Sequence, residues 1–155
     1  MTQETLAYVA LGANLGDAQG TVRQALQWLD ELPDTRLVRA SSLYRTAPVD
    51  SSGPDYINAV AQVRTRIDAH RLLSMLQGLE QRAGRERPYP NAPRTLDLDL
   101  LLFGDAHTAT AQLQLPHPRM YQRAFVLVPL AEIAPALVSP EQLQAVAGQG
   151  VTRMA

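Results

Sequence analysis

The feature that most constrains the fold is the order in which two apolar periodicities follow each other along the chain. Successive side chains of a strand alternate between two faces, whereas a helix returns to the same face after about 3.6 residues. From the N-terminus the chain shows an apolar run, a helical stripe, two alternating stretches, a second helical stripe and a third alternating stretch. These patterns cover residues 6–11, 22–32, 36–45, 56–66, 72–83 and 96–103. The order predicts an α+β fold, a ferredoxin-like βαββαβ sandwich with two helices on one face of a largely antiparallel sheet.

Capping residues mark the ends of the two predicted helices. Asp17 and Asp68 stand just before the helical stripes, where an aspartate side chain accepts hydrogen bonds from the first free backbone N–H groups. Gly84 follows the second stripe and is typical of a helix end. These positions support two helices between the predicted strands.

The C-terminal third shows weaker patterns. Residues 107–115 are expected to form a hairpin, and short helical pieces are expected after it, interrupted at Pro129 and Pro135. The sequence shows no internal repeat and no linker, and its length of 155 residues is typical of one domain. We therefore expect a single domain over 1–155, consisting of the sandwich and a C-terminal extension of short helices.

Charge and composition exclude several functions. All 14 basic residues are Arg, there is no Cys, and the net charge is −1. Lysine Schiff-base chemistry, the P-loop lysine, thiolate catalysis and cysteine metal sites are therefore excluded. The charge balance gives no reason to expect nucleic acid or a membrane surface as partner, and no apolar run approaches the ~18 residues of a membrane span. We expect a cytoplasmic protein.

Two acidic residues on one predicted strand form the most informative motif. Asp97 and Asp99 share one face of the strand, about 6–7 Å apart, while the leucines between and around them enter the core. Two carboxylates on a rigid element can hold hard cations while a triphosphate supplies further oxygen ligands. The alternative is a solvated polar face, with Arg94 balancing part of the charge.

An arginine-rich segment precedes these carboxylates. Its arginines are Arg82, Arg85, Arg87 and Arg94. One guanidinium group can donate two parallel hydrogen bonds to the oxygens of a phosphate. The segment would therefore place cations beside a metal-bound polyphosphate. A solvated charged loop is the alternative.

Residues in two further segments could bind a ligand. His117 lies between two prolines that fix its backbone, so that its ring could contact a phosphate, although a structural role is as common. Tyr56 and Asn58 share one strand face, and the Asn58 amide offers the donor and the acceptor that a heteroaromatic ring requires. The glycine-flanked segment Gly12–Asp17 is interpreted as a strand-to-helix turn.

Taken together, these segments resemble the 6-hydroxymethyl-7,8-dihydropterin pyrophosphokinase (HPPK) family. Five motifs in order carry the resemblance: Gly12–Gly16, Ser42–Thr46, Pro54–Asn58, Arg94–Asp99 and Leu115–Pro118. The Arg-Thr-Leu-Asp-Leu-Asp hexapeptide is the most specific of them. The likeness extends from Tyr8 to about Pro135.

The resemblance implies a reaction and a set of residues. ATP would donate its β,γ-pyrophosphoryl unit to the hydroxymethyl oxygen of the pterin, and AMP would leave. Asp97 and Asp99 would hold two Mg²⁺ ions, and the catalytic set would be Arg85, Arg94, Asp97 and Asp99. The pterin would be bound by Thr46, Pro48, Val49, Tyr56, Asn58 and Phe125. ATP would be bound by Glu80, Arg85, Arg87, Arg94, His117 and Arg123.

The resemblance also implies loops that close over both substrates, and a monomer with neither nucleic acid nor membrane as partner. Two other functions are compatible with the same residues. A non-catalytic ligand-binding module of ferredoxin-like fold would produce no AMP, and a metal-dependent phosphohydrolase would release phosphate from ATP without a pterin.

Overall fold

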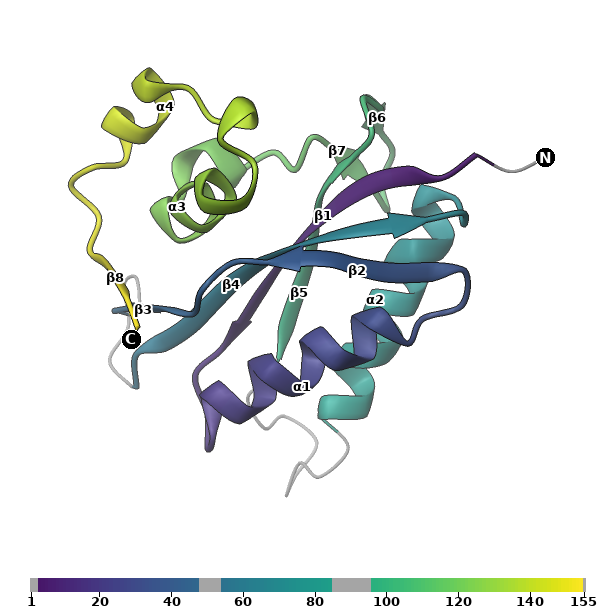
Figure 1. The fold of residues 1–155 in the computed structure, drawn as a ribbon, viewed down its shortest axis with the longest axis horizontal. Coiled ribbons are helices and arrows are strands. Elements are labelled where there is room, and N and C mark those ends of the chain that lie inside the picture. The colour runs from purple at the N-terminus through teal and green to yellow at the C-terminus, as the bar shows by residue number, and fades with distance from the viewer. Residues whose placement is uncertain (1–2, 48–53, 85–95, 155) are drawn as a thin grey trace.

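A computed structural model describes residues 3–47, 54–84 and 96–154, and Figure 1 shows their arrangement. The strands are β1 (Thr5–Ala13), β2 (Thr35–Ala40), β3 (Tyr44–Thr46), β4 (Tyr56–Thr65), β5 (Asp97–Phe103), β6 (Thr108–Ala109), β7 (Gln114–Leu115) and β8 (Val151–Arg153). The helices are α1 (Ala18–Asp30), α2 (Ala69–Ala83), α3 (Ala124–Ile133) and α4 (Pro140–Ala145), with 3-10 turns η1 (Met120–Gln122) and η2 (Pro135–Leu137).

The protein is built around one antiparallel sheet of six strands. Its strand order is β5-β1-β4-β3-β8, and β2 pairs with β4 on the same side as β3. Every pair of neighbouring strands in it is antiparallel. The predicted α+β class and antiparallel sheet are therefore confirmed.

The helices cover both faces of the sheet. α1 and α2 lie on one face, and α3 and α4 lie on the other (Figure 1). On the α1/α2 face, β1 and β4 contribute Ala7, Val9, Leu11, Ile57, Ala59, Ala61 and Val63 to the core. On the α3 face, Tyr8, Ala10 and Val60 pack against the apolar side chains of α3. Alternate residues of the same strands thus build two cores, as a sheet buried on both faces requires.

The predicted helix caps are present. The Asp17 carboxylate accepts a hydrogen bond from the Gly20 N–H at 3.1 Å, and the Asp68 carboxylate accepts one from the Arg71 N–H at 2.8 Å. Each such cap stabilises a helix by about 1 kcal/mol. Gly84 ends α2, as predicted.

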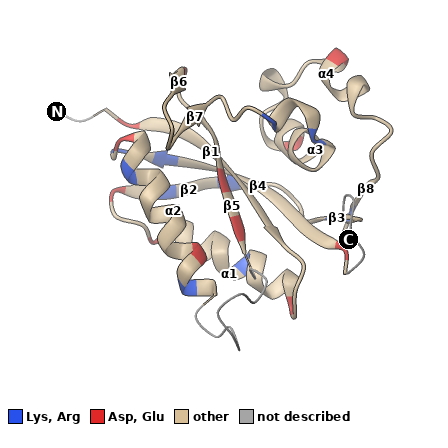
Figure 2. Ribbon diagram, turned by 180° about the vertical axis from the view of Figure 1, so that it is seen from behind, with Lys and Arg blue, Asp and Glu red and all other residues tan. Residues whose placement is uncertain are grey.

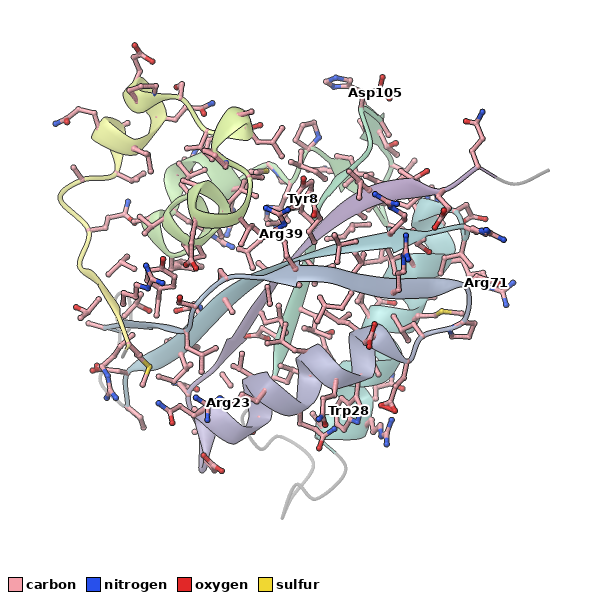
Figure 3. The ribbon with its side chains drawn as sticks, in the orientation of Figure 1. Tyr8, Arg23, Trp28, Arg39, Arg71 and Asp105 are labelled. Atoms are coloured by element: carbon pink, nitrogen blue, oxygen red, sulfur yellow. The ribbon has the colours of Figure 1, made fainter. Side chains whose placement is uncertain are left out.

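The expected interruption at Pro129 is wrong, because Pro129 lies inside α3. A proline in a helix loses one backbone hydrogen bond and costs about 3 kcal/mol. Six of the ten residues of α3 are buried, and burying each large apolar side chain gains about 1.5–3 kcal/mol, so packing outweighs the cost. Beneath α3, Arg39 Nη1 donates to the Ile133 carbonyl at 3.2 Å, and Figure 3 shows Arg39 and Tyr8 between the sheet and this helix.

Two other expectations need correction. The single strand predicted over 36–45 is divided into β2 and β3, because the Ser41 hydroxyl accepts the hydrogen bond of the Val60 N–H at 2.9 Å where the strand bends. The extension after Pro116 contains a strand, β8, as well as helices. The hairpin expected over 107–115 is present as β6 and β7. None of the helices in the described ranges is both long and apolar enough to cross a bilayer.

Candidate active site

The carboxylates of Asp97 and Asp99 lie on the sheet face that α3 partly covers. Leu98 and Leu100, which alternate with them along β5, are only 4% and 3% exposed and belong to the α1/α2 core. Asp97 is exposed, and the Asp99 side chain is 44% exposed. Figure 2 shows the acidic part of β5 in red. The strand alternation predicted from the sequence is therefore confirmed.

A row of residues across three strands connects this pair to Asn58. Gly12 of β1 is the register partner both of Asp97 in β5 and of Asn58 in β4. With strands about 4.8 Å apart, the α-carbons of Asp97 and Asn58 are about 10 Å apart. A Cβ at Gly12 would lie 3.0 Å from the Asn58 Nδ2 atom, so the missing side chain leaves room for that amide. Gly12 thus belongs to a strand rather than to the predicted turn, in which Gly16 is the residue with positive φ, +58°.

A cavity of about 230 Å³ opens beside this row. Its walls are Thr46, Ala47, Tyr56, Asn58, Asp99, Arg123 and Phe125. Four of the six residues expected to bind a pterin are among them. Two residues expected to face metal or ATP, Asp99 and Arg123, form another part of the wall. The structure therefore brings residues from β3, β4, β5 and the start of α3 around one small space.

The Asn58 side chain is held in place and only partly satisfied. It is 6% exposed, and its Oδ1 accepts a hydrogen bond from the Thr46 hydroxyl at 2.8 Å. Among the residues that the structure describes, no partner accepts from its Nδ2. Buried polar groups normally have partners, so this amide is suited to a ligand with hydrogen-bonding edges.

The start of α3 delivers a cation and an aromatic ring to the cavity. Arg123 Nη1 lies 3.9 Å from Asp99 Oδ2, and the Arg123 guanidinium lies 5.4 Å from the centre of the Phe125 ring. The Arg123 side chain is 27% exposed. It therefore stands between the acidic strand and the aromatic wall, where it can contact anionic groups of a ligand.

The other end of α3 is tied to β3 through Glu132. Its carboxylate accepts hydrogen bonds from the Ser42 N–H and hydroxyl and, at 2.6 Å, from the Tyr44 hydroxyl, and lies 3.7 Å from Arg153. Burial alone would raise the pKa of Glu132, but the hydrogen bonds from Tyr44 and Ser42 and the charge of Arg153 outweigh it and lower that pKa. The pKa of Tyr44 is raised to about 12, mainly because the hydroxyl is buried and secondly because it donates a hydrogen bond to Glu132.

His117 borders a second cavity, of about 260 Å³, on the other side of Asp99. The other walls of this cavity are Leu73, Leu98, Leu100, Ala111, Gln112, Leu113, Gln114 and Pro118. The backbone N–H of His117 donates to the Leu101 carbonyl at 2.9 Å. The ring Nδ1 of His117 accepts from the backbone N–H of Arg119 at 3.2 Å. Burial lowers the pKa of His117 against the opposing charge of Asp99, and Arg123 and Arg119 lower it further. The ring is therefore neutral near pH 7.

Glu80 reaches the same strand from α2. Its carboxylate accepts a hydrogen bond from the Leu98 N–H at 2.8 Å, between the two aspartates in sequence. The contact fixes the edge of β5 against α2. Glu80 therefore lies close to the acidic strand, and its contact with ATP stays a prediction.

Several predicted site residues lie outside the described residues: Pro48, Val49, Arg85, Arg87 and Arg94. Their proposed roles stay predictions, as does the expected loop closure.

The acidic pair suits a cation that brings other ligands with it. Within the described ranges no group of three or more His, Asp or Glu side chains could hold a metal ion by itself. Mg²⁺ commonly binds one or two carboxylates together with substrate phosphates and water. Asp99, which lines both cavities, and the exposed Asp97 on the same strand face fit that mode.

Some residues of the site escaped the sequence analysis. Gln112 and Gln114 of the second cavity lie in a hairpin without a recognisable motif. Gln149, from the far C-terminus, lines a third cavity of about 690 Å³ that shares Arg123 and Phe125 with the first. Gly12 could have been recognised, since a glycine inside a strand often marks a close approach.

A buried amide, an aromatic ring, an arginine and a carboxylate surround two cavities that share Asp99, an arrangement that fits an enzyme with two substrates, one heteroaromatic and one anionic. The sequence model of the 7,8-dihydro-6-hydroxymethylpterin-pyrophosphokinase (HPPK) family matches residues 8–135. The chain belongs to this family.

Two curated relatives can be aligned with this chain over most of their length. The chain is 44% identical over 135 residues to the 2-amino-4-hydroxy-6-hydroxymethyldihydropteridine pyrophosphokinase of Pseudomonas aeruginosa, covering 86% of this chain and 83% of the relative. It is 42% identical over 129 residues to the Bacillus subtilis protein of the same name, covering 83% and 77%.

The fold is also found in solved structures. A triple mutant of Plasmodium falciparum HPPK-DHPS matches with a TM-score of 0.69 at 13% identity, over 87% of this chain. The chain spans about 40% of that longer protein, and the likeness concerns the fold alone.

Proposed function

We propose that the protein transfers the pyrophosphoryl unit of ATP to the hydroxymethyl group of 6-hydroxymethyl-7,8-dihydropterin in folate biosynthesis. The observation that carries the proposal is the row Asp97–Gly12–Asn58, which sets a carboxylate for the phosphate end two strands away from an amide for the pterin end. Family membership and the names of the relatives support the same activity.

The pterin occupies the cavity of about 230 Å³. Asn58 binds the hydrogen-bonding edge of the ring, and Phe125 stacks on its face. Thr46 fixes the Asn58 amide and Tyr56 completes the wall. Pro48 and Val49 are proposed to cover the remaining side.

ATP lies on the other side of Asp99. The walls of the cavity beside His117 combine leucines with polar residues such as Gln112 and Gln114, which suits the adenine base, and Asp99 in the same wall lies where the phosphates would approach. Neutral His117 and cationic Arg123 serve the phosphates as hydrogen-bond donors. Glu80, Arg85, Arg87 and Arg94 complete the proposed ATP contacts.

Asp97 and Asp99 would hold two Mg²⁺ ions together with the triphosphate. Bound there, Mg²⁺ would neutralise phosphate charge and polarise the phosphorus that is attacked. The chain itself supplies the hard oxygen ligands and keeps both carboxylates on a rigid strand.

The reaction joins the two sites. The hydroxymethyl oxygen forms a bond to the β-phosphorus of ATP, the bond from that phosphorus to the α,β-bridging oxygen breaks, and AMP leaves with that oxygen. The alcohol proton is released to solvent. Arg123, beside both the aromatic wall and Asp99, stabilises the charge on the transferring group, with Arg85 and Arg94 in the same role.

We further propose that residues 1–155 act as one catalytic domain, as a monomer in the cytoplasm, with neither nucleic acid nor membrane as partner. The strand order β5-β1-β4-β2/β3, with α1 and α2 on one face, supports the ferredoxin-like description. Size-exclusion chromatography with light scattering at working concentration tests the monomer.

The activity is tested by mixing the protein with ATP, Mg²⁺ and 6-hydroxymethyl-7,8-dihydropterin and measuring AMP. AMP is expected only when the pterin is present. Phosphate release without pterin would indicate the phosphohydrolase instead, and no turnover of ATP in either mixture would indicate the binding module.

A further inference from the structure

The C-terminal arm, residues 138–154, lies beyond residues 8–135, which the family model matches, yet it reaches the substrate cavity. β8 pairs with β3, and Val151 is the register partner of Thr46. Gln149, Gly150 and Val151 also line a cavity of about 690 Å³. That cavity shares Thr46, Ala47, Arg123 and Phe125 with the smaller one proposed for the pterin.

Gln149 makes the most specific contact of this arm. Its Oε1 accepts a hydrogen bond from the Ala124 N–H at 2.9 Å, and its Nε2 donates to the Gln122 carbonyl at 2.9 Å. The two backbone groups flank Arg123. An exposed glutamine ordinarily keeps its rotamer freedom, so a side chain that uses both ends of its amide on one turn forms a defined clasp.

The clasp replaces a missing helix cap. Arg123 occupies the N-cap position of α3 but makes no capping hydrogen bond with its side chain. The first N–H groups of a helix need acceptors, and Gln149 supplies one from 25 residues away. The Arg123 guanidinium has no acceptor and cannot cap the helix itself, so the acceptor has to come from another residue.

We propose that Gln149 is a positioning residue, which holds the backbone around Arg123 so that Arg123 and Phe125 face the pterin cavity. The inference rests on the proposed function. It extends the functional part of the chain to a residue outside the region matched by the family.

The rest of the arm is held independently of this amide. β8 pairs with β3, the Met154 N–H donates to the Leu43 carbonyl at 2.9 Å, and Arg153 lies 3.7 Å from Glu132. Val146 is 3% exposed and packs in the α3 core. Removing the Gln149 amide therefore loosens the start of α3 and leaves the arm in place.

The experiment compares three variants with the wild type. Gln149→Leu removes both hydrogen bonds at similar size, and Gln149→Glu keeps the acceptor for Ala124 while losing the donor. Gln144→Leu is the matched control, since Gln144 is exposed on α4 and has no side-chain hydrogen bond to the described residues. Each is measured for pterin binding by fluorescence titration, for binding of a non-hydrolysable ATP analogue without pterin, for AMP formation and for thermal stability.

For Gln149→Leu we expect a pterin dissociation constant about fivefold higher, the equivalent of one hydrogen bond. The ATP analogue should lose less, about twofold, because its proposed contacts other than Arg123 lie outside the start of α3. Gln149→Glu is expected to recover only part of the affinity, because its second carboxylate oxygen faces the Gln122 carbonyl without a proton between them, and Gln144→Leu to match the wild type.

Wild-type pterin affinity in Gln149→Leu would overturn the inference. Equal weakening of both ligands together with a lower melting temperature would also overturn it, because that pattern is general loosening. Failure of the wild type to form AMP would count against the proposed function, whereas these comparisons of binding judge Gln149 separately.

Discussion

Replacing Gly12 by alanine separates binding from stability at the centre of the site. The new Cβ would lie 3.0 Å from Asn58 Nδ2, below the 3.4 Å at which ordinary contact begins. Asn58 would have to retreat by about 0.4 Å, but its Oδ1 is held by the Thr46 hydroxyl at 2.8 Å. We therefore expect the amide to lose about one hydrogen bond to the pterin, about 1 kcal/mol, or a fivefold higher dissociation constant.

The stability of Gly12→Ala should change little. Alanine restricts the unfolded chain more than glycine does, which stabilises a strand residue by about 0.5–1 kcal/mol where the backbone permits it. The close contact offsets part of this gain, so the free energy of unfolding should stay within about 1 kcal/mol of the wild type.

The assay pairs fluorescence titration with pterin and urea unfolding of the same samples. Gly78→Ala is the matched control, because Gly78 is exposed in α2 and a Cβ there would meet nothing within 4 Å. It should raise stability and leave pterin affinity unchanged. Wild-type affinity in a stably folded Gly12→Ala protein would refute the role of the row.

Three other predictions concern the carboxylates and the amide. Asp97→Ala or Asp99→Ala should abolish AMP formation with a melting temperature near that of the wild type, and normal turnover in either would contradict the metal assignment. Asn58→Ala should weaken pterin binding by about tenfold in fluorescence titration and spare the ATP analogue; the assignment fails if only ATP binding is lost. The lowered pKa of Glu132 stabilises the fold fully above its ordinary value of 4.5, and this contribution is lost as pH falls through the lower folded value. Glu132→Gln should therefore lower stability at pH 7 by about 1–2 kcal/mol and flatten the acid decline in urea titrations; equal slopes for both proteins would disprove it.

Local patterns predicted the elements that depend on near neighbours. The caps at Asp17 and Asp68 and the alternation of β4 and β5 follow from a few adjacent residues, and all are present. The same alternation put Asp97 and Asp99 on one face. Strand and helix periodicity was therefore sufficient for the framework and for the acidic pair.

Features decided by distant contacts could not be predicted. The break between β2 and β3 depends on a hydrogen bond between Ser41 and Val60, and the three residues of β8 form a strand only because β3 offers a free edge. Pro129 is accepted in α3 because of what that helix packs against. Gln149 reaches the site by the path of the whole C-terminal arm. Periodicity within one segment carries no information about such partners.

The pairing of β8 with β3 has a practical consequence for anyone who purifies or joins this protein to another. Any sequence appended after residue 155 begins next to the strand that carries Thr46, whereas the N-terminal end emerges at the opposite side of the molecule (Figure 1). An affinity handle or a fluorescent partner therefore belongs at the N-terminus. At the other end it would begin directly after the residues of β8 that pair with β3.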